Sequence, residues 1–499
     1  MKRFLAVILA AAAIPVTAAC ADSGKKGTLD SSGTAEAVTS EGKTEETGTY
    51  LQSNLPEGLD FNGSTVVIHT RGDYNSVDEI FVEDTSNQVY EAIYKRNSNV
   101  EEKLKVRIEV FKSAGWDSYY TEANSQLRAS VSSNDAAFDI ISGWQPCIPE
   151  LAAEGLMTDL NTVQYIGTGM PWWTQSLVEE LTVGGKLHFV TGDISVLTML
   201  GSMRVFVCNK ALSDDSGIPN LYETVNKGEW TIDFVSQLIK DMYKDNGDSQ
   251  VDEKDTFGLQ MGCANDVDAF IAASLVKMSV KDDNGIPYLD MPVNQMSSLI
   301  DKLYDLMYEN QGTYVTSADA ADTAFAMMQE NRLLLAPFPV DTLRIAFNDL
   351  KSDFMVLPYP KLDENQKEYG TRIQDALQIW GIPTDIVGDK LMAASATLEA
   401  LACESYNSVT PVYFDNALKG RYTRDEESKA MMDLIKDSVF LSFEMIYNNY
   451  VGTPCYTLRN MLGGKSRDFM SYWSKRETAI NDAFNTVVEK LIEPNTAAS

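Results

Sequence analysis

Three short runs decide the fold of this chain: STVVIHT (64–70), VRIEVF (106–111) and FDIISGW (138–144). Each is rich in β-branched or aromatic residues, which is typical of a buried strand. Apolar residues recur at helical spacing between the first two runs, and a Ser- and Ala-rich helical stretch precedes the third. Strand, helix, strand, helix, strand predicts a mainly parallel sheet with helices on both faces, and therefore an α/β fold.

Further runs predict more strands and a long helical region. The strand candidates are LHFVTGDIS (187–195), VFVCNK (205–210), RLLLAPF (332–338) and FMVLPYP (354–360). Helical spacing of apolar residues appears after Thr231, a candidate N-cap, and again over residues 294–310. The last predicted helix carries on one face Ile480, Phe484, Val487, Val488 and Leu491.

The N-terminus has the pattern of a secretory signal. Lys2 and Arg3 precede an apolar run from Phe4 to Ile14, which is shorter than the roughly 20 residues that span a bilayer. The stretch TAAC (17–20) resembles the lipobox of bacterial lipoproteins, in which the cysteine takes a diacylglycerol and becomes the mature N-terminus. We expect a signal peptide over 1–19 and a lipid on Cys20. The alternative is an ordinary signal with Cys20 nearby by chance.

Residues 20–58 are expected to form a disordered tether, because they are polar and small and hold no aromatic residue before Tyr50. The expected location is the extracytoplasmic face of a cell membrane, reached through the lipid alone. The formal net charge of −31 argues against nucleic acid as a partner.

Five cysteines follow Cys20, namely Cys147, Cys208, Cys263, Cys403 and Cys455. Their odd number leaves at least one unpaired, and their spacing fits no metal framework. We expect Cys403, inside the apolar run LEALAC, to be a small core residue.

Several later segments resemble type 2 extracellular solute-binding lipoproteins, the capture subunits of bacterial ABC importers, in their carbohydrate-type group. The matching segments are ELAAEGLMTDLN, MPWW, GGKLHFVTGDIS, VFVCNKAL, NLYETVNKGEWTID, GIPTDIVGDKLMAASATLEALACESY and VTPVYFDNALKGRYTRDEES. They run in the family's order through most of the chain beyond residue 60.

The resemblance implies two α/β lobes of the periplasmic-binding-protein type, joined by crossover strands, with the ligand in the cleft between them. The first lobe is expected to comprise 59–204 and 357–425, and the second 205–356 and 426–495. The implied partners are a small solute, most plausibly a mono- or oligosaccharide, and the transmembrane subunits of a permease. The protein itself is expected to be a monomer.

Ligands of open α/β sheets bind beyond the carboxyl ends of the strands, which directs attention to the residues that follow them. Arg71, Asp73 and Tyr74 follow the first strand, where a guanidinium and a carboxylate suit a polyol, although a solvated turn explains them nearly as well. Asp193 lies in TGDIS, either facing ligand or capping a turn. Phe338, Arg372 and Asp375 are candidates from their strand-end position alone.

Aromatic candidates come from the same reasoning, because a sugar ring stacks its C–H face on an aromatic ring. Trp144 with Gln145 follows a strand directly and is either a stacking platform or a rim tryptophan packed on its own loop. Trp172 and Trp173 are read as one cleft residue and one core residue, and Trp380 is a weaker cleft candidate. Trp230 and Trp473 are expected in the core.

The acidic stretch KDNGDSQVDEKD (244–255) resembles a calcium loop through Asn246, Asp248, Asp252 and Asp255. Lys244 occupies the first ligand position and Ser249 replaces the mid-loop glycine, and both changes weaken a Ca²⁺ site. We expect a structural loop without metal, and no cofactor elsewhere.

No enzyme motif accounts for the chain. Its only two histidines, His69 and His188, lie in predicted strands, and it has no nucleophile elbow, zinc-protease motif or dinucleotide fingerprint. The sequence therefore predicts a non-enzymatic receptor. Two alternatives stay open: a lipid-anchored glycan hydrolase that uses a carboxylate pair, and a surface adhesin.

Overall fold

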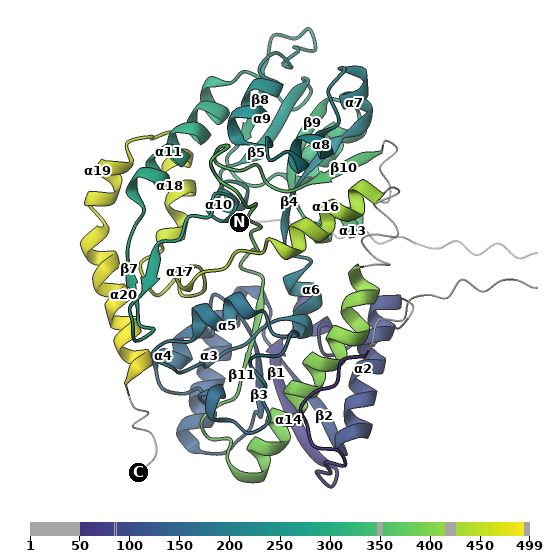
Figure 1. The fold of residues 1–499 in the computed structure, drawn as a ribbon, viewed down its shortest axis with the longest axis vertical. Coiled ribbons are helices and arrows are strands. Elements are labelled where there is room, and N and C mark those ends of the chain that lie inside the picture. The colour runs from purple at the N-terminus through teal and green to yellow at the C-terminus, as the bar shows by residue number, and fades with distance from the viewer. Residues whose placement is uncertain (1–49, 84, 86, 347–352, 415–425, 494–499) are drawn as a thin grey trace, which may run out of the picture. The chain divides into compact units, whose positions relative to one another are not determined.

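The computed structural model describes residues 50–83, 85, 87–346, 353–414 and 426–493, without the side chains of 74, 116–120 and 344–346. The predicted lipid site at Cys20, the signal peptide and most of the tether therefore lie outside the described residues. Mixed α/β structure fills the described part, with two main sheets that are each flanked by helices (Figure 1).

The first sheet has four strands in the order β11-β3-β1-β2. They are β1 (Ser64–Arg71), β2 (Val106–Ser113), β3 (Ile140–Trp144) and β11 (Gln378–Gly381). β1 pairs in parallel with β2 and with β3, and β11 runs antiparallel to β3. The three runs that open the chain therefore form the predicted parallel core of this sheet.

The second sheet has five strands in the order β10-β4-β9-β5-β8. They are β4 (Arg204–Asn209), β5 (Phe257–Gly262), β8 (Thr313–Thr316), β9 (Leu333–Pro339) and β10 (Phe354–Leu357). β5 is parallel to β8 and β9, whereas β4 is antiparallel to β9 and β10. A separate hairpin joins β6 (Ser279–Lys281) to β7 (Pro287–Leu289).

Helices fill the connections and cover the sheets (Figure 1). Up to β5 they are α1 (Tyr74–Asp78), α2 (Gln88–Leu104), α3 (Trp116–Ser133), α4 (Pro149–Ala153), η1 (Leu160–Thr162), α5 (Gln175–Leu181), η2 (Asp193–Ser195), α6 (Val196–Met199), α7 (Lys210–Asp215), α8 (Leu221–Asn226) and α9 (Ile232–Ile239). After β5 they are α10 (Asn265–Ala273), α11 (Val293–Tyr304), η3 (Asp305–Glu309), α12 (Ala321–Gln329), α13 (Val340–Ala346), α14 (Gly388–Glu404), η5 (Ser405–Val409), α16 (Glu426–Asp437), α17 (Phe443–Ile446), η7 (Pro454–Tyr456), α18 (Thr457–Gly463), α19 (Phe469–Ser474) and α20 (Glu477–Ile492).

The chain passes between the two sheets more than once. β1 to β3 belong to the first sheet, β4 to β10 to the second, and β11 returns to the first. The bounds expected for the two lobes stay a prediction.

The hydrophobic core has two parts. Because side chains alternate along a strand, Val205 and Val207 of β4 join a cluster that also includes the first sheet, whereas Phe206 and Cys208 join a cluster on the other face. The second cluster contains Trp230 and Trp473, as the sequence predicts. No disulfide joins the five described cysteines, and Cys403 is buried.

One predicted strand is wrong. Residues 187–195 form no strand: Val190 makes a single bridge to Trp380, and the segment ends in η2. Residues 187–192 are all buried, so the segment has the continuous burial of an interior strand without a strand's pairing.

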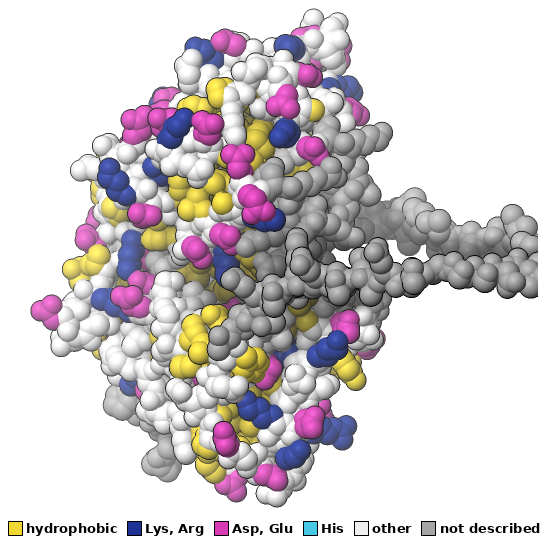
Figure 2. Space-filling view, turned by 45° about the vertical axis from the view of Figure 1, so that its right-hand side comes forward, with side chains coloured by type: hydrophobic (Ala, Val, Ile, Leu, Met, Phe, Trp, Pro, Cys, Tyr) yellow, Lys and Arg dark blue, Asp and Glu magenta, His cyan; other side chains and the backbone are white. Residues whose placement is uncertain are grey.

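Charges of both signs are interspersed on the molecular surface. Figure 2 shows Lys and Arg side chains scattered among Asp and Glu side chains over the described part of one face, with hydrophobic side chains between them. This pattern differs from the continuous basic surface that binds nucleic acid. Within the described residues, no helix is long and apolar enough to cross a bilayer.

Candidate functional site

The carboxyl ends of β1 and β3 bring together Arg71, Asp73 and Trp144. The Arg71 Nε atom lies 2.7 Å from a carboxylate oxygen of Asp73, and the guanidinium lies 4.9 Å from the centroid of the Trp144 ring. Arg71 is buried, whereas the Asp73 side chain keeps 32% of its exposure. The buried Arg71 side chain therefore holds Asp73 in place, while part of the Asp73 carboxylate still faces solvent.

Trp144 links this group to the segment before β11. Its indole N–H donates to the Asp375 carbonyl at 2.6 Å, and the side chain is only 3% exposed. Gln145 donates its own backbone N–H to the Leu377 carbonyl at 2.9 Å. The segment that carries Arg372 and Asp375 is thus fastened to the ends of the first sheet.

The same segment also reaches the second sheet, because the Arg204 N–H donates to the Arg372 carbonyl at 2.9 Å. The Arg372 and Asp375 side chains are half-buried. Among the described residues, the Arg372 Nη1 atom is buried without a hydrogen-bond partner. Arg372 and Asp375 therefore stand between the strand ends of both sheets, where the sequence predicts ligand contact.

On the second-sheet side, Arg459 is the centre of a polar group that sequence reasoning missed. Its Nε donates to Asp268 at 2.5 Å, its Nη2 donates to Asn265 at 3.1 Å, and its guanidinium lies 4.2 Å from the centroid of the Tyr456 ring. Asp268 and Asn265 belong to α10, directly after β5, and Arg459 belongs to α18.

Burial and opposite charge set the titration of this group. Burial raises the pKa of Asp268 to about 6, and the positive charges of Arg459 and Arg372 oppose the rise. Burial lowers the pKa of Arg459, but Asp268 outweighs it, so the pKa lies above its ordinary value. Burial, followed by the charge of Asp375, raises the pKa of the Tyr456 phenol. Electrostatic coupling thus connects Asp375 to Tyr456.

A second ion pair, between two buried side chains, lies at the start of β4. Arg204 at the start of β4 contacts Asp266, which also accepts the Gly262 N–H at 2.8 Å. Burial raises the pKa of Asp266 to about 7 against the charge of Arg204. Because both side chains are inaccessible, this pair positions α10 and does not meet a ligand.

Two groups of residues, linked by the charge effects of Arg372 on Asp268 and of Asp375 on Tyr456, are together called the strand-end site: Arg71, Asp73, Trp144, Asp268, Arg372, Asp375, Tyr456 and Arg459. The site offers a carboxylate at Asp73, guanidinium donors at Arg372 and Arg459, and the ring of Tyr456. Such groups accept and donate hydrogen bonds to hydroxyls and provide an aromatic face.

Gln145 and Asp193 make hydrogen bonds within the protein outside the strand-end site. Gln145 donates its side-chain amide to the carbonyls of Met445 and Ile446 at 3.2 and 2.5 Å, tying the end of β3 to α17. Asp193 accepts the Thr410 hydroxyl at 2.5 Å, and burial raises its pKa to about 6 against the Thr410 bond and the charge of Lys436. The side chain of Tyr74 lies outside the described residues.

The remaining aromatic candidates have packing roles in this structure. Trp172, Trp173, Trp380 and Phe338 are each 0–1% exposed. The Trp173 indole donates to Glu399 at 3.0 Å, and the Trp380 indole donates to Ser195 at 2.7 Å. Their assignment to the ligand site stays a prediction without support from this geometry.

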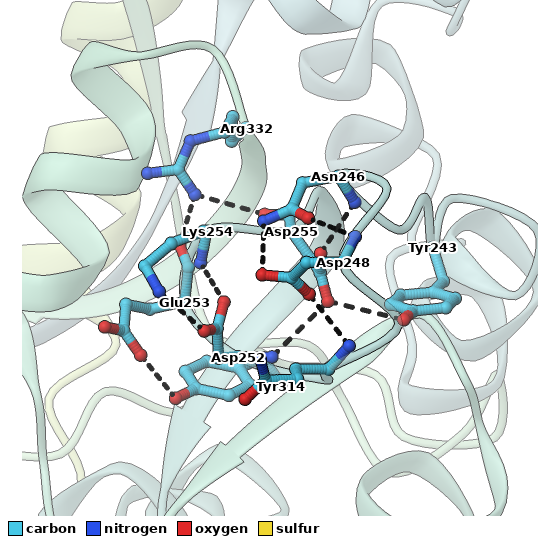
Figure 3. A network of polar contacts seen from close by, with 10 residues as sticks. Tyr243, Asn246, Asp248, Asp252, Glu253, Lys254, Asp255, Tyr314 and Arg332 are labelled. Atoms are coloured by element: carbon cyan, nitrogen blue, oxygen red, sulfur yellow. Dashed lines mark hydrogen bonds and ion pairs between the residues drawn. The ribbon is translucent and has the colours of Figure 1, made fainter.

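Figure 3 shows the acidic loop with its oxygens turned toward protein donors. Asp255 accepts the N–H of Asn246 at 2.9 Å and of Asp252 at 3.3 Å, and Asp252 accepts from Lys254. Asp248 accepts the N–H of Gln250 at 2.8 Å. Within the described residues, no group of three or more His, Cys, Asp or Glu side chains is arranged to hold a metal ion. The loop has the contacts of a structural turn.

Comparison with known proteins identifies the fold. No family model and no curated protein matches the chain. Among solved structures, a cyclo/maltodextrin-binding protein complexed with maltotetraose matches with a TM-score of 0.51 and 14% identity, over 86% of this chain and 98% of that one. The chain has the fold of these two-lobed binding proteins.

Two further structures share this binding-protein fold. The GacH receptor of Streptomyces glaucescens, solved unliganded and with acarbose, has a TM-score of 0.52 at 13% identity over 86% of this chain and 99% of that one. A sugar transporter from Rhizobium etli in an open conformation has a TM-score of 0.50 at 13% identity, over the same shares. The matches span nearly the whole of each of these binding proteins.

Proposed function

We propose that this protein is the extracytoplasmic solute-binding receptor of an ABC importer, and that its solute is a mono- or oligosaccharide. The observation that carries the proposal is the two-lobed fold, shared with sugar-binding receptors over 86% of the chain. The strand-end site supports it, because its polar groups lie where ligands of open α/β sheets bind.

Under this proposal, the solute is held by hydrogen bonds from both sides of the strand-end site. Asp73 accepts hydroxyl protons, Arg372 and Arg459 donate to hydroxyl oxygens, and Tyr456 offers its ring to an apolar sugar face. A ligand that touches groups of both lobes favours the closed arrangement by its differential affinity for the two states. The closed receptor then delivers the solute to the transmembrane subunits.

The receptor acts as a monomer, is anchored to the membrane by a lipid on Cys20 and releases its solute chemically unchanged. The ion pairs of Asp73 with Arg71 and of Asp268 with Arg459 engage two carboxylates of the site, which supports a binding role over a hydrolytic one. A glycosidase needs a carboxylic acid and a carboxylate that are both free to reach the scissile bond.

The test is a thermal-shift screen of the chain from Thr49 onward against a saccharide and small-solute panel. Each hit is followed by calorimetry and by mass spectrometry of the recovered ligand. We expect a saccharide to raise the melting temperature, since a ligand at about 100 times its Kd adds about 2.7 kcal/mol of stability. Hydrolysis of the ligand would overturn the receptor function. The saccharide assignment would be overturned if no sugar raised the melting temperature and a solute of another chemical class did.

A further inference from the structure

A pocket of about 760 Å³ lies along β8, the edge strand of the second sheet. None of its lining residues belongs to the strand-end site. Its volume falls within the range of small-molecule sites, roughly 300–1,000 Å³. The pocket is therefore large enough for a ligand and separate from the proposed cleft.

Fixed aromatic rings line this pocket. The rings of Tyr243 and Phe257 lie 5.2 Å apart between centroids, and those of Phe257 and Tyr314 lie 5.1 Å apart. Figure 3 shows the phenol oxygens of Tyr243 and Tyr314 bonded to the acidic loop, at Asp255 and Glu253. Because these hydroxyls are engaged by the protein, the rings are held in place as walls.

Tyr308 of η3 provides a further ring to the lining. Its hydroxyl donates to the Leu462 carbonyl at 2.6 Å and lies 3.4 Å from the Cys263 Sγ. The Lys465 ammonium lies 5.3 Å from the centroid of the same ring. Tyr308 is thus anchored in the same way as Tyr243 and Tyr314.

Most of the polar groups in the lining are neutral. The side chains of Thr313 and Thr316 donate to carbonyls of the protein. Gln311 and Ser317 are exposed and have no side-chain hydrogen bond within the described part of the chain. Lys465 is the single charged residue of the lining. The groups available to a ligand are therefore an amide, a hydroxyl and one ammonium beside aromatic rings.

We propose that this pocket is a second saccharide-binding site, independent of the strand-end site. A neutral sugar ring matches the lining, because its C–H face packs on an aromatic ring and its hydroxyls need directional partners such as Gln311, Ser317 and Lys465. A site of this kind holds a second saccharide molecule at the edge of the second sheet.

Cys263 gives a local readout, since it lines the pocket and is half-buried, whereas the other four described cysteines are buried. The full chain is alkylated with iodoacetamide at alkaline pH, and modification of Cys263 is followed by peptide mass spectrometry. The probes are maltotetraose, cellotetraose, xylotetraose, mannotetraose and chitotetraose. We expect at least one to slow the reaction roughly tenfold at about ten times its Kd, because only the free fraction reacts.

Variants assign the protection to the pocket. Tyr314→Ala and, as a milder change at an exposed side chain, Gln311→Ala should weaken it, whereas Tyr288→Ala should not, because Tyr288 is an exposed tyrosine of β7 outside the lining. Asp73→Asn, in the strand-end site beside the first sheet, should leave the protection intact. The proposal is overturned if no probe protects Cys263, if Tyr314→Ala and Gln311→Ala both keep full protection, or if Asp73→Asn abolishes it.

Discussion

At Arg459, a guanidinium that is 26% exposed neutralises a carboxylate, Asp268, that is only 4% exposed. Removing one partner of a buried pair leaves the other charge uncompensated, which costs more than the pair contributes. The interaction is therefore tested by comparing single and double variants and not by one substitution.

We expect Arg459→Ala to lower the free energy of unfolding by about 3 kcal/mol, and Arg459→Ala with Asp268→Asn to recover part of that loss. Urea denaturation measures both. Arg467→Ala serves as the control, because Arg467 pairs with Asp301 and Asp305 on the exposed surface and its loss should change little. Equal losses in the single and double variants would contradict the account.

Asp193 provides a pH prediction. Burial raises its pKa in the folded chain to about 6, above the ordinary value of 3.8, so the folded state binds the proton more tightly than the unfolded state. Its contribution to stability is present below about pH 4 and is lost as the pH rises through about 6. We expect Asp193→Asn to remove this fall when unfolding free energies are compared across that range. Parallel curves for the two proteins would contradict the assignment.

Among the elements, hydrophobic runs were sufficient to predict β1, β3, β4, β9 and β10, because strands that are mostly buried hold few polar residues. β2 was also predicted, although most of its side chains are not buried. β5 was not foreseen, although FGLQMG (257–262) is fully buried in the second sheet. The helix that follows it, α10, carries Asp268, whose partner Arg459 is 191 residues away. A single sequence holds no signal for a pairing over that distance, and this is why Asp268, Tyr456 and Arg459 of the strand-end site were missed.

The start of α9 agrees with its sequence signal, since the Thr231 hydroxyl accepts the Phe234 N–H at 3.2 Å. We expect Thr231→Ala to cost about 1 kcal/mol of unfolding free energy, because the first turn loses a hydrogen-bond acceptor. Thr486→Ala, at an exposed position inside α20, should change stability little. Similar losses at both positions, measured by thermal or urea unfolding, would remove the capping explanation.

For the acidic loop, the contacts in Figure 3 make a metal dispensable. We expect neither Ca²⁺ at millimolar concentration nor EDTA to change the melting temperature, since the oxygens of Asp252 and Asp255 already accept protein hydrogen bonds. Differential scanning calorimetry makes the comparison, with Mg²⁺ as the control for ionic strength. A rise specific to Ca²⁺ would restore the loop as a metal site.

For the whole molecule, the proposed attachment to the membrane depends on a single atom, the sulfur of Cys20 that carries the lipid. We expect Cys20→Ser to move the protein from the membrane fraction to the medium or the soluble envelope fraction, because lipid attachment would be lost. Cys263→Ser should leave the distribution unchanged. Metabolic labelling with an alkyne fatty acid and fractionation of the native host measure both, and membrane retention of unlabelled Cys20→Ser would exclude the anchor.

The absence of a disulfide among the five described cysteines has a consequence for the conditions under which the folded body is stable. The stability of the described body does not depend on disulfide bonds, so dithiothreitol should not change its unfolding midpoint. Export would need no thiol-oxidising catalyst, and anaerobic, sulfide-rich surroundings would not loosen the fold. The same property allows the body to be produced in a reducing bacterial cytoplasm for the unfolding and calorimetry measurements above.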